Sequence, residues 1–327
     1  ITGAGTIVNG GYTLTAGGDN SSTTFSGVMS GSGGLTKTGS GTLTLSGTNT
    51  YTGATTISNG DLIVSGALSD STAVSVASGN TYTLGAADTV GSITGAGTIA
   101  NGGYTLTMGS SSDSTFSGVR SGSGILYMNG SGTFTLTGDN TYTGATELLD
   151  GTLVVAGDLA TSGIAFSNGA QLTLGADMAL TGELSGTGEI ATAGYTITLG
   201  DSSSWNNPIV ISGTGGLTKT GSGTIQMLNA STYTGTTTIN NGTLSVSTYN
   251  GALSNSSLLS VASGATYTLN EDDTFASITG AGTIATGGNT LTAGNSSNQT
   301  FSGVISGSGG LTKTGSGTLS LSGTNTY

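Results

Sequence analysis

The stretch GSGGLTKTGSGTLTLSGTNTYTGATTISNGDLIVSG, from Gly31 to Gly66, determines how the rest of the chain is interpreted. In its segments TLTLSG and DLIVSG, apolar residues alternate with small or polar ones, which is the two-residue period of a β-strand. Strong helix formers are scarce, because Gly, Ser and Thr occupy most positions. Asn59-Gly60 lies between two strand segments, and Asn followed by Gly favours positive φ at a turn. The stretch therefore predicts short strands joined by tight corners.

This stretch recurs along the chain. Segments of the type SGSGGLTKTG begin in steps of 91, 91 and 94 residues, at Ser30, Ser121, Ser212 and Ser306. Segments of the type ITGAGTI give approximate module starts at residues 1, 93, 184 and 278. No Pro-rich or charged linker separates the modules, so we predict one continuous β-solenoid array of about 3.5 modules over residues 1–327.

The two ends of the chain resemble each other more than they resemble the inner modules. Residues 1–51 and 278–327 agree at about 40 of 50 positions. We therefore expect a higher-order repeat of about 276 residues, and we expect the chain to be a fragment of a longer repetitive protein.

Each module divides into four stretches of about 20 to 24 residues, which is the length of one turn of a three-sided parallel β-helix. We therefore predict an all-β fold, a single-stranded parallel β-solenoid with about four coils per module of about 91 residues. A β-propeller blade is too short, at about 40 to 50 residues. Immunoglobulin-like arrays come close in length, but we expect a large aromatic core and Pro-rich joints in them. This chain has one Trp and one Pro, Trp205 and Pro208. Strict alternation also disfavours disorder.

Composition excludes several classes of function. The 327 residues include 62 Gly, 16 acidic and 4 basic residues, no His and no Cys, with a net charge of −12. Disulfides, His- or Cys-based metal and haem sites, and Ser-His-Asp or Cys-His nucleophiles cannot be built. Four basic residues cannot neutralise a row of phosphates, so we expect no nucleic-acid partner. No apolar run approaches the roughly 18 residues needed to span a bilayer. We predict no catalytic residue, no metal site and no cofactor.

The acidic run Glu271, Asp272 and Asp273 is the one cluster that could suggest catalysis or calcium binding. The matching turns of other modules carry Asp88 and Asp177, which favours a solvated corner. A calcium loop would also need acids at alternating positions.

The basic residues follow the module. Lys37, Lys219 and Lys313 share one position, and Arg120 stands where the first module has Met29. We interpret the lysines as solvated turn charges along one face that discourage aggregation. Guidance of lateral contact with acidic partners or neighbouring fibres is the alternative.

Aromatic residues are also interpreted as structural. Four tyrosines of the NTYTG segments share one module position: Tyr51, Tyr142, Tyr233 and Tyr327. We expect them to pack at a corner of the coil rather than to bind sugars. Trp205 lies near the module position of Phe25 and Phe116, which predicts that it belongs to the core.

The stretch from Gly31 to Gly66 resembles the passenger-associated repeat of bacterial autotransporters, with its glycine-rich entry, GGL-K-G-GTL-L, NTYTG-T-I and G-L-V segments. The resemblance recurs over 121–157, over 212–247 and from residue 306 onward, and directly covers about 130 residues. The second copy departs most, with Tyr127, Met128 and Asn129 in place of Thr-Lys-Thr. The resemblance implies a right-handed β-helix that is exported across the outer membrane and displayed or released at the cell surface.

These observations favour a non-enzymatic structural segment of an extracellular bacterial stalk or fibre that supports adhesion, aggregation or matrix formation. Self-association, end to end or laterally, is the partner interaction that fits such a segment. The alternative is a glycan- or surface-binding adhesin module, with host or matrix glycans as partners. A polysaccharide-active enzyme is the third reading, and it would depend on Asp272 and Asp273.

Overall fold

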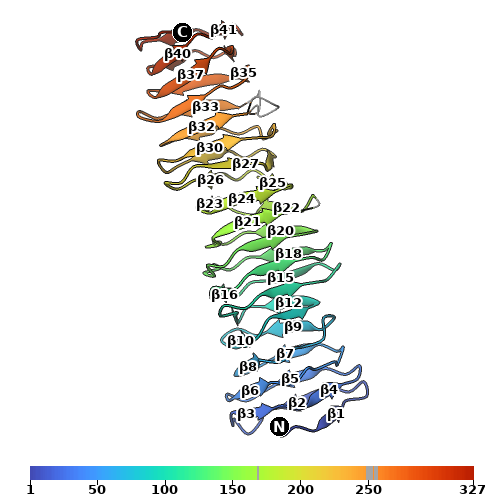
Figure 1. Cartoon of the computed structure of the whole chain (residues 1–327). Coiled ribbons are helices and arrows are strands. Elements are labelled where there is room, and N and C mark those ends of the chain that lie inside the picture. Colours follow the sequence, from blue (N-terminus) through green and yellow to red (C-terminus); the bar gives the residue numbers. More distant parts are fainter. Residues whose placement is uncertain (168, 248–252, 254–256) are drawn as a thin grey trace. The chain divides into compact units, whose positions relative to one another are not determined.

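The computed structural model describes residues 1–167, 169–247, 253 and 257–327. It consists of two compact units, Ile1–Gln171 and Leu172–Tyr327. The described residues form 42 β-strands and no helix, and the strands pair in parallel as a β-solenoid of about 15 turns. The predicted all-β parallel solenoid is confirmed (Figure 1). The part of the chain that is described contains no helix with the length and hydropathy of a membrane span. A continuous array over 1–327 stays a prediction.

The first unit has three parallel sheets, which we call the β5, β6 and β17 sheets. The β5 sheet contains, in order, β2 (Leu14–Ala16), β5 (Leu35–Lys37), β7 (Thr55–Ile57), β9 (Ala73–Val76), β12 (Ser92–Gly95), β15 (Ser114–Phe116), β18 (Thr133–Leu136) and β20 (Thr152–Val155). The β6 sheet contains β3 (Thr23–Phe25), β6 (Thr42–Leu45), β8 (Asp61–Val64), β10 (Thr81–Leu84), β13 (Thr98–Ala100) and β16 (Val119–Ser121). The β17 sheet contains β11 (Asp88–Val90), β14 (Leu106–Met108), β17 (Leu126–Met128), β19 (Thr146–Leu148) and β21 (Gly163–Phe166). A separate pair is formed by β1 (Thr6–Val8) and β4 (Val28–Ser30).

The second unit is built in the same way. Its largest sheet contains β23 (Met178–Leu180), β26 (Ile197–Leu199), β29 (Leu217–Lys219), β31 (Thr237–Ile239), β33 (Leu258–Val261), β36 (Ser277–Gly280), β39 (Gln299–Phe301) and β42 (Leu319–Leu321). A second sheet contains β27 (Trp205–Asn207), β30 (Thr224–Met227), β32 (Thr243–Val246), β34 (Thr266–Thr268), β37 (Thr283–Gly287) and β40 (Val304–Gly307). The third contains β35 (Asp273–Phe275), β38 (Leu291–Ala293) and β41 (Leu311–Lys313). The remaining strands are β22 (Gln171–Leu174), β24 (Glu183–Gly186), and β25 (Glu189–Ala191), which pairs with β28 (Val210–Ser212).

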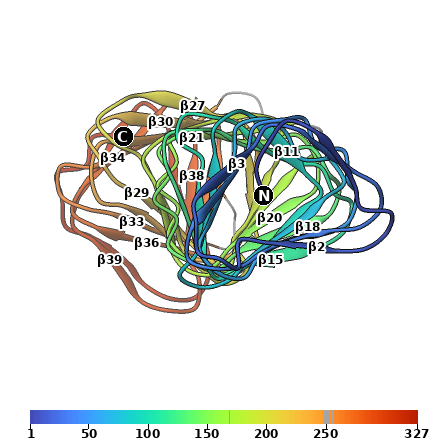
Figure 2. The ribbon, with the colours of Figure 1, turned by 90° about the horizontal axis from the view of Figure 1, so that it is seen from below.

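Alternation along each strand places one set of side chains inside the coil. In β6 the pattern is half-buried, buried, half-buried, buried, with Leu43 and Leu45 inside. Parallel register then stacks like positions, so Leu43 pairs with Leu62 and Leu62 with Tyr82. Strands spaced about 4.8 Å apart keep these side chains in contact along the coil axis. Figure 2, seen along the strand stack, shows β2, β15, β18 and β20 of the β5 sheet on one side of the first unit.

One module does not correspond to a whole number of turns. Within the β5 sheet the pairing runs from β5 through β7, β9 and β12 to β15, which is four turns. The copy of β5 in the next module is β17, which comes two strands after β15 and belongs to a different sheet. A module of 91 residues therefore makes about four and two-thirds turns, which refines the expected four coils. Successive copies of a residue consequently face different sides of the coil.

The corners of the coil depend on glycine. Gly60 in the Asn59-Gly60 corner has φ of 71°, and Gly151 and Gly242 repeat this geometry at 73° and 67°. These values confirm the positive φ that the Asn/Asp-Gly pairs predicted. At another corner, a Cβ on Gly47 would lie 2.0 Å from the carbonyl oxygen of Gly27 in the turn below. Many of the 62 glycines therefore allow successive turns to approach each other closely.

Candidate functional site

The repeated lysine lies inside the coil in the first and third copies, where its interpretation as a solvated turn charge was wrong. Lys37 at the end of β5 has no exposed surface. Its Nζ donates to the carbonyl oxygens of Thr38 at 2.7 Å, Gly39 at 2.7 Å and Asn59 at 3.0 Å. Burial lowers the pKa of the Lys37 ammonium, and the charge of Asp61 partly opposes this shift. The ammonium therefore joins two successive turns by binding the carbonyls of both their corners.

Lys219 in the third copy shows the same arrangement, and Lys313 in the fourth does not. Lys219 is also buried, and its Nζ donates to the carbonyls of Thr220, Gly221 at 2.9 Å and Asn241 at 3.2 Å. Lys313 is exposed, as the solvated-turn interpretation predicted, and its Nζ donates to the carbonyls of Thr314 and Gly315 at 2.6 and 2.8 Å. Lys219 and Lys313 lie in different sheets of the second unit, so the expected single charged face was wrong.

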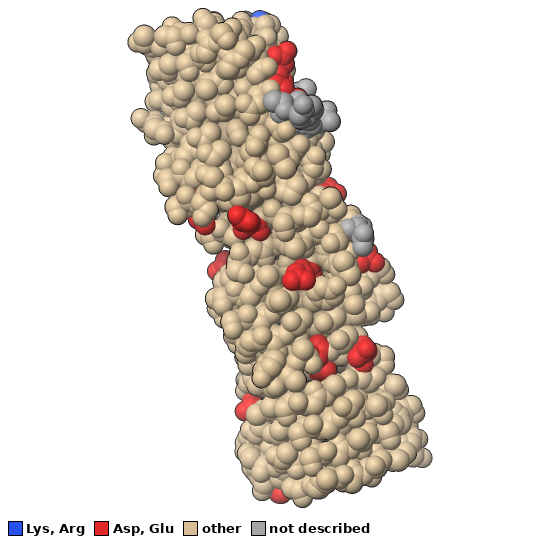
Figure 3. All heavy atoms as spheres, viewed as in Figure 1, with Lys and Arg blue, Asp and Glu red and all other residues tan. Residues whose placement is uncertain are grey.

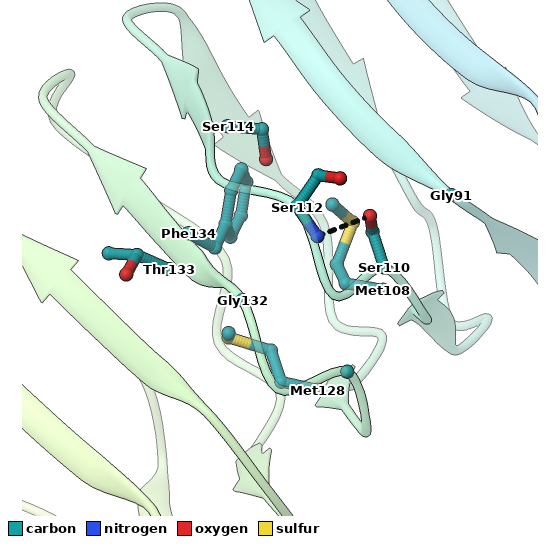
Figure 4. Close-up of a pocket in the computed structure, with 10 residues that line it drawn as sticks. Gly91, Met108, Ser110, Ser112, Ser114, Met128, Gly132, Thr133 and Phe134 are labelled. Atoms are coloured by element: carbon teal, nitrogen blue, oxygen red, sulfur yellow. Dashed lines mark hydrogen bonds between the residues drawn. The ribbon is translucent and has the colours of Figure 1, made fainter.

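The second copy replaces this lysine with Met128. Met128 is buried beside Met108 on the neighbouring strand, where the first copy has Lys37 beside Ala16. A cavity of only about 10 Å³ remains between these methionines, Phe134 and the turn at Ser110–Ser112 (Figure 4). Such a cavity holds at most one water molecule. The substitution therefore leaves a packed apolar interior and no binding pocket of useful size.

Arg120 is a second buried cation, at the position of Met29. Its guanidinium carbon lies 3.7 Å from the centroid of the Tyr142 ring, and Nη2 donates to the Gly124 carbonyl at 3.2 Å. Nε and Nη1 have no hydrogen-bond partner. Burial lowers the pKa of Arg120 to about 10. This arginine is part of the core and does not face a surface site.

The acidic run is dispersed by the fold. Asp273 is buried, and its Oδ2 accepts a hydrogen bond from the hydroxyl of Tyr267, whereas the exposed Asp272 accepts the amide of Thr290 through Oδ1. Burial raises the pKa of Asp273 to about 6, although the Tyr267 hydrogen bond opposes the shift. The predicted solvated corner is correct for Asp272 and wrong for Asp273. No group of three or more acidic residues suited to a metal ion occurs within the described ranges.

Asp88 repeats this arrangement in the first unit. Its Oδ2 accepts the Tyr82 hydroxyl at 2.7 Å, and its Oδ1 accepts the Leu68 amide at 3.1 Å. Burial raises the pKa of Asp88 to about 6, against the effect of these hydrogen bonds. In the middle module the residue aligned with Asp88 is Met178, and the neighbouring Asp177 is exposed and accepts the Thr196 amide. The predicted solvated corner therefore holds for Asp177 and is wrong for Asp88.

The tyrosines of the NTYTG segments pack inside, as predicted, with one exception. Tyr51, Tyr142 and Tyr233 are fully buried, and each shares a hydrogen bond with the threonine four residues later. Tyr327 is 45% exposed. Trp205 is buried, which confirms its expected place in the core.

A different set of tyrosines is exposed, and the sequence interpretation missed it. Tyr12, Tyr104 and Tyr195 are 82%, 45% and 41% exposed. Each ends a tight turn in which its amide binds the carbonyl three residues earlier. The signal that could have identified them is the preceding Gly-Gly or Ala-Gly pair, which forms a projecting turn. Tyr12 precedes β2 and Tyr104 precedes β14, so in the first unit they lie before strands of different sheets.

The surface carries little positive charge. Acidic side chains are scattered as separate spots over the face drawn in Figure 3, and basic atoms are visible only at its upper edge. This agrees with the burial of Lys37, Arg120 and Lys219. The exposed faces therefore present mostly Ser, Thr, Asn and Gly.

Comparison with known proteins identifies the repeated stretch. A family model described as passenger-associated-transport-repeat matches residues 35–64, 126–155, 217–246 and 311–327. A curated relative, "Adhesin BmaC autotransporter" from Brucella suis biovar 1 (strain 1330), is 40% identical over 119 residues. That match covers 34% of this chain and 4% of the relative. No solved structure matches the chain significantly.

Proposed function

We propose that this chain, which carries passenger-associated transport repeats, is a non-enzymatic structural segment of a bacterial stalk or fibre that is displayed at the cell surface or secreted. One observation carries the proposal: the chain directs three of its four cations, five tyrosines and two of its acids inward, and its buried lysines join successive turns. Lys37, for example, binds the carbonyl of Asn59, which lies 22 positions further along the sequence. A solenoid built in this way transmits stiffness from turn to turn. In this proposal the segment holds a binding tip, or its own lateral surface, away from the cell and so supports adhesion, aggregation or matrix formation.

Reach is the property that tests this proposal. The chain is displayed on bacteria between an anchoring barrel and a bead-binding reporter domain, beneath a surface polymer layer of known thickness. One, two and four copies of the chain in tandem are compared with Gly/Ser linkers of the same numbers of residues. The reach of a stiff stalk grows in proportion to the number of copies, whereas the reach of a flexible chain grows only as the square root of its length, so bead capture should rise more steeply with copy number for the stalk. An equally shallow rise for stalk and linkers would refute the structural role.

Self-association belongs to the same proposal. The net charge of −12 opposes lateral contact at low ionic strength, and salt screens this repulsion. Sedimentation of the purified chain across a range of salt concentrations measures it. Monomers at every salt concentration would remove aggregation through this segment from the proposal.

Glycan binding is the second candidate function, and the exposed tyrosines favour it. Aromatic rings that project from Ser/Thr-rich turns provide flat apolar faces with polar neighbours. Replacement of Tyr12, Tyr104 and Tyr195 by alanine should abolish binding to a glycan array if these residues are sugar platforms. A variant that keeps the wild-type binding profile excludes this use of the tyrosines.

A further inference from the structure

A hollow lies on the outside of the second copy. Its volume is about 120 Å³, and it is lined by Tyr127, Glu147, Leu148, Leu149, Ala165 and Ser167. Tyr127, Glu147 and Ala165 are direct neighbours on the adjacent strands β17, β19 and β21. All three alternate with buried residues, so they occupy the outer face of the β17 sheet.

The residues that form this hollow are those by which the second copy departs from the others. The first copy has Thr36, Thr56 and Ser75 at the same register positions. The threonine pair is replaced by the longer side chains of Tyr127 and Glu147, which project further from the sheet. Ala165, the residue beside them, is smaller than the serine of the first copy. The departure at Tyr127 therefore has a structural result of its own, separate from the change of the neighbouring lysine to Met128.

The Glu147 carboxylate lacks a cation. No hydrogen bond or ion pair joins it to another residue in the described part of the chain, although its side chain is half-buried. All four basic residues of the chain are engaged elsewhere: three lysines bind corner carbonyls, and Arg120 lies over Tyr142. A half-buried carboxylate next to an aromatic ring attracts a cation from outside the chain.

We propose that this hollow binds the arginine side chain of a basic polypeptide. A planar guanidinium stacks on an aromatic ring and binds a carboxylate through two parallel N–H donors, which a compact ammonium cannot do. The chain already shows the first of these contacts internally, in the guanidinium of Arg120 above Tyr142. The net charge of −12 draws basic segments toward the surface. The hollow accommodates the guanidinium together with its adjoining methylene groups. The inference rests on this local geometry and not on the role proposed for the whole chain.

The test is titration of the whole chain with short peptides, followed by NMR. The probe is acetyl-Gly-Arg-Gly-amide, and the control peptide carries citrulline, which has the same shape without the charge. We expect the arginine peptide to shift the amide signals of Tyr127, Glu147 and Ala165, and we expect the citrulline peptide to bind at least tenfold more weakly.

Two variants make the test specific. Glu147→Gln should weaken arginine binding about tenfold, and Tyr127→Thr, which restores the residue of the first copy, should weaken it about two- to fivefold. Glu183→Gln removes an equal charge from an exposed position in the second unit and should leave binding unchanged. Because Thr is native at this position in the other copies, Tyr127→Thr should fold normally. Equal binding of both peptides, or unchanged binding by Glu147→Gln, overturns the proposal. Shifts at the hollow with a neutral oligosaccharide but not with the arginine peptide overturn it in favour of a sugar site.

Discussion

Replacement of Lys37 by methionine removes the ammonium that joins two corners of the coil and keeps most of the side-chain volume. Three carbonyl oxygens, those of Thr38, Gly39 and Asn59, lose their donor. The second copy carries methionine at the same position, so the substitution is compatible with the fold. The neighbour on the preceding turn is Ala16 here and Met108 in the second copy, so the double variant Ala16→Met/Lys37→Met, which copies both methionines, separates lost hydrogen bonds from looser packing.

The expected magnitude follows from these contacts. A hydrogen bond to a charged donor contributes about 1.5 to 3 kcal/mol. Three such bonds would give a larger sum, but dehydration of the ammonium offsets part of it, as the lowered pKa of Lys37 indicates. Water can also reach some of the corner carbonyls once the lysine is gone. We expect a net local loss of about 2 to 3 kcal/mol, which corresponds to about 30- to 150-fold faster local opening.

Native-state hydrogen exchange is the appropriate assay, because a repeat protein need not unfold in one step. The informative amides are those of Thr38 and Ser58, which bind the carbonyls of Ala16 and Lys37 on neighbouring turns. The amides of Asn129 and Leu149 make the equivalent bonds in the second copy and provide an internal reference. Both reference amides should exchange at unchanged rates in the variant.

The result that refutes this reasoning is also clear. If Lys37→Met changes exchange at Thr38 and Ser58 by less than about twofold, the ammonium contributes no net stability at the corner. The lysine would then be a buried charge that the fold tolerates without a gain in stability. Acceleration spread evenly over the first unit would instead indicate global destabilisation, and it would contradict a local role in joining two corners.

Three further predictions concern buried groups and corners. The pKa of Asp88 is raised to about 6 in the folded state, so the folded state binds the proton more tightly than the unfolded chain does. The free energy of unfolding should therefore increase by about 1 kcal/mol as the pH falls from 7.5 to 5. Urea titrations at the two pH values should show that Asp88→Asn removes this increase, and an unchanged pH dependence in the variant would contradict the prediction. Arg120→Met, which copies Met29, should raise the free energy of unfolding by about 1 to 2 kcal/mol in the same assay, because it removes a buried charge with two unpartnered nitrogens. A loss of stability would show that the contact with the Tyr142 ring contributes more than burial of the charge costs. Gly60→Ala should lower the free energy of unfolding by about 3 kcal/mol or more, because its Cβ would lie 2.5 Å from two carbonyl oxygens. Gly79 has a similar φ but open space around it, so Gly79→Ala should lower stability by only about 1 to 2 kcal/mol. Thermal unfolding of both variants measures the difference, and equal losses would show that φ alone matters.

The candidate sites show how much could be inferred without coordinates. Burial of Tyr51, Tyr142 and Trp205 was predictable, since an aromatic residue in an alternating strand repeat has an apolar interior available. The burial of Asp88 and Asp273 was not, because a carboxylate enters the core only where a tyrosine hydroxyl from another strand can bind it. The exposure of Tyr12 and the hollow at Tyr127 likewise depend on which neighbouring strand lies beside each residue.

The sequence by itself determined the strands, the corners and the repeat. Alternation and the positive φ of an Asn-Gly pair are properties of a few consecutive residues, so they can be identified in the printed chain. Only the tertiary structure decided which face each copy occupies, because a module spans about four and two-thirds turns and every copy moves to another sheet. It also decided that the lysine points inward. The carbonyl of Asn59 comes within 3.0 Å of Lys37 Nζ only after the next turn has stacked on the first, and no local pattern contains that contact.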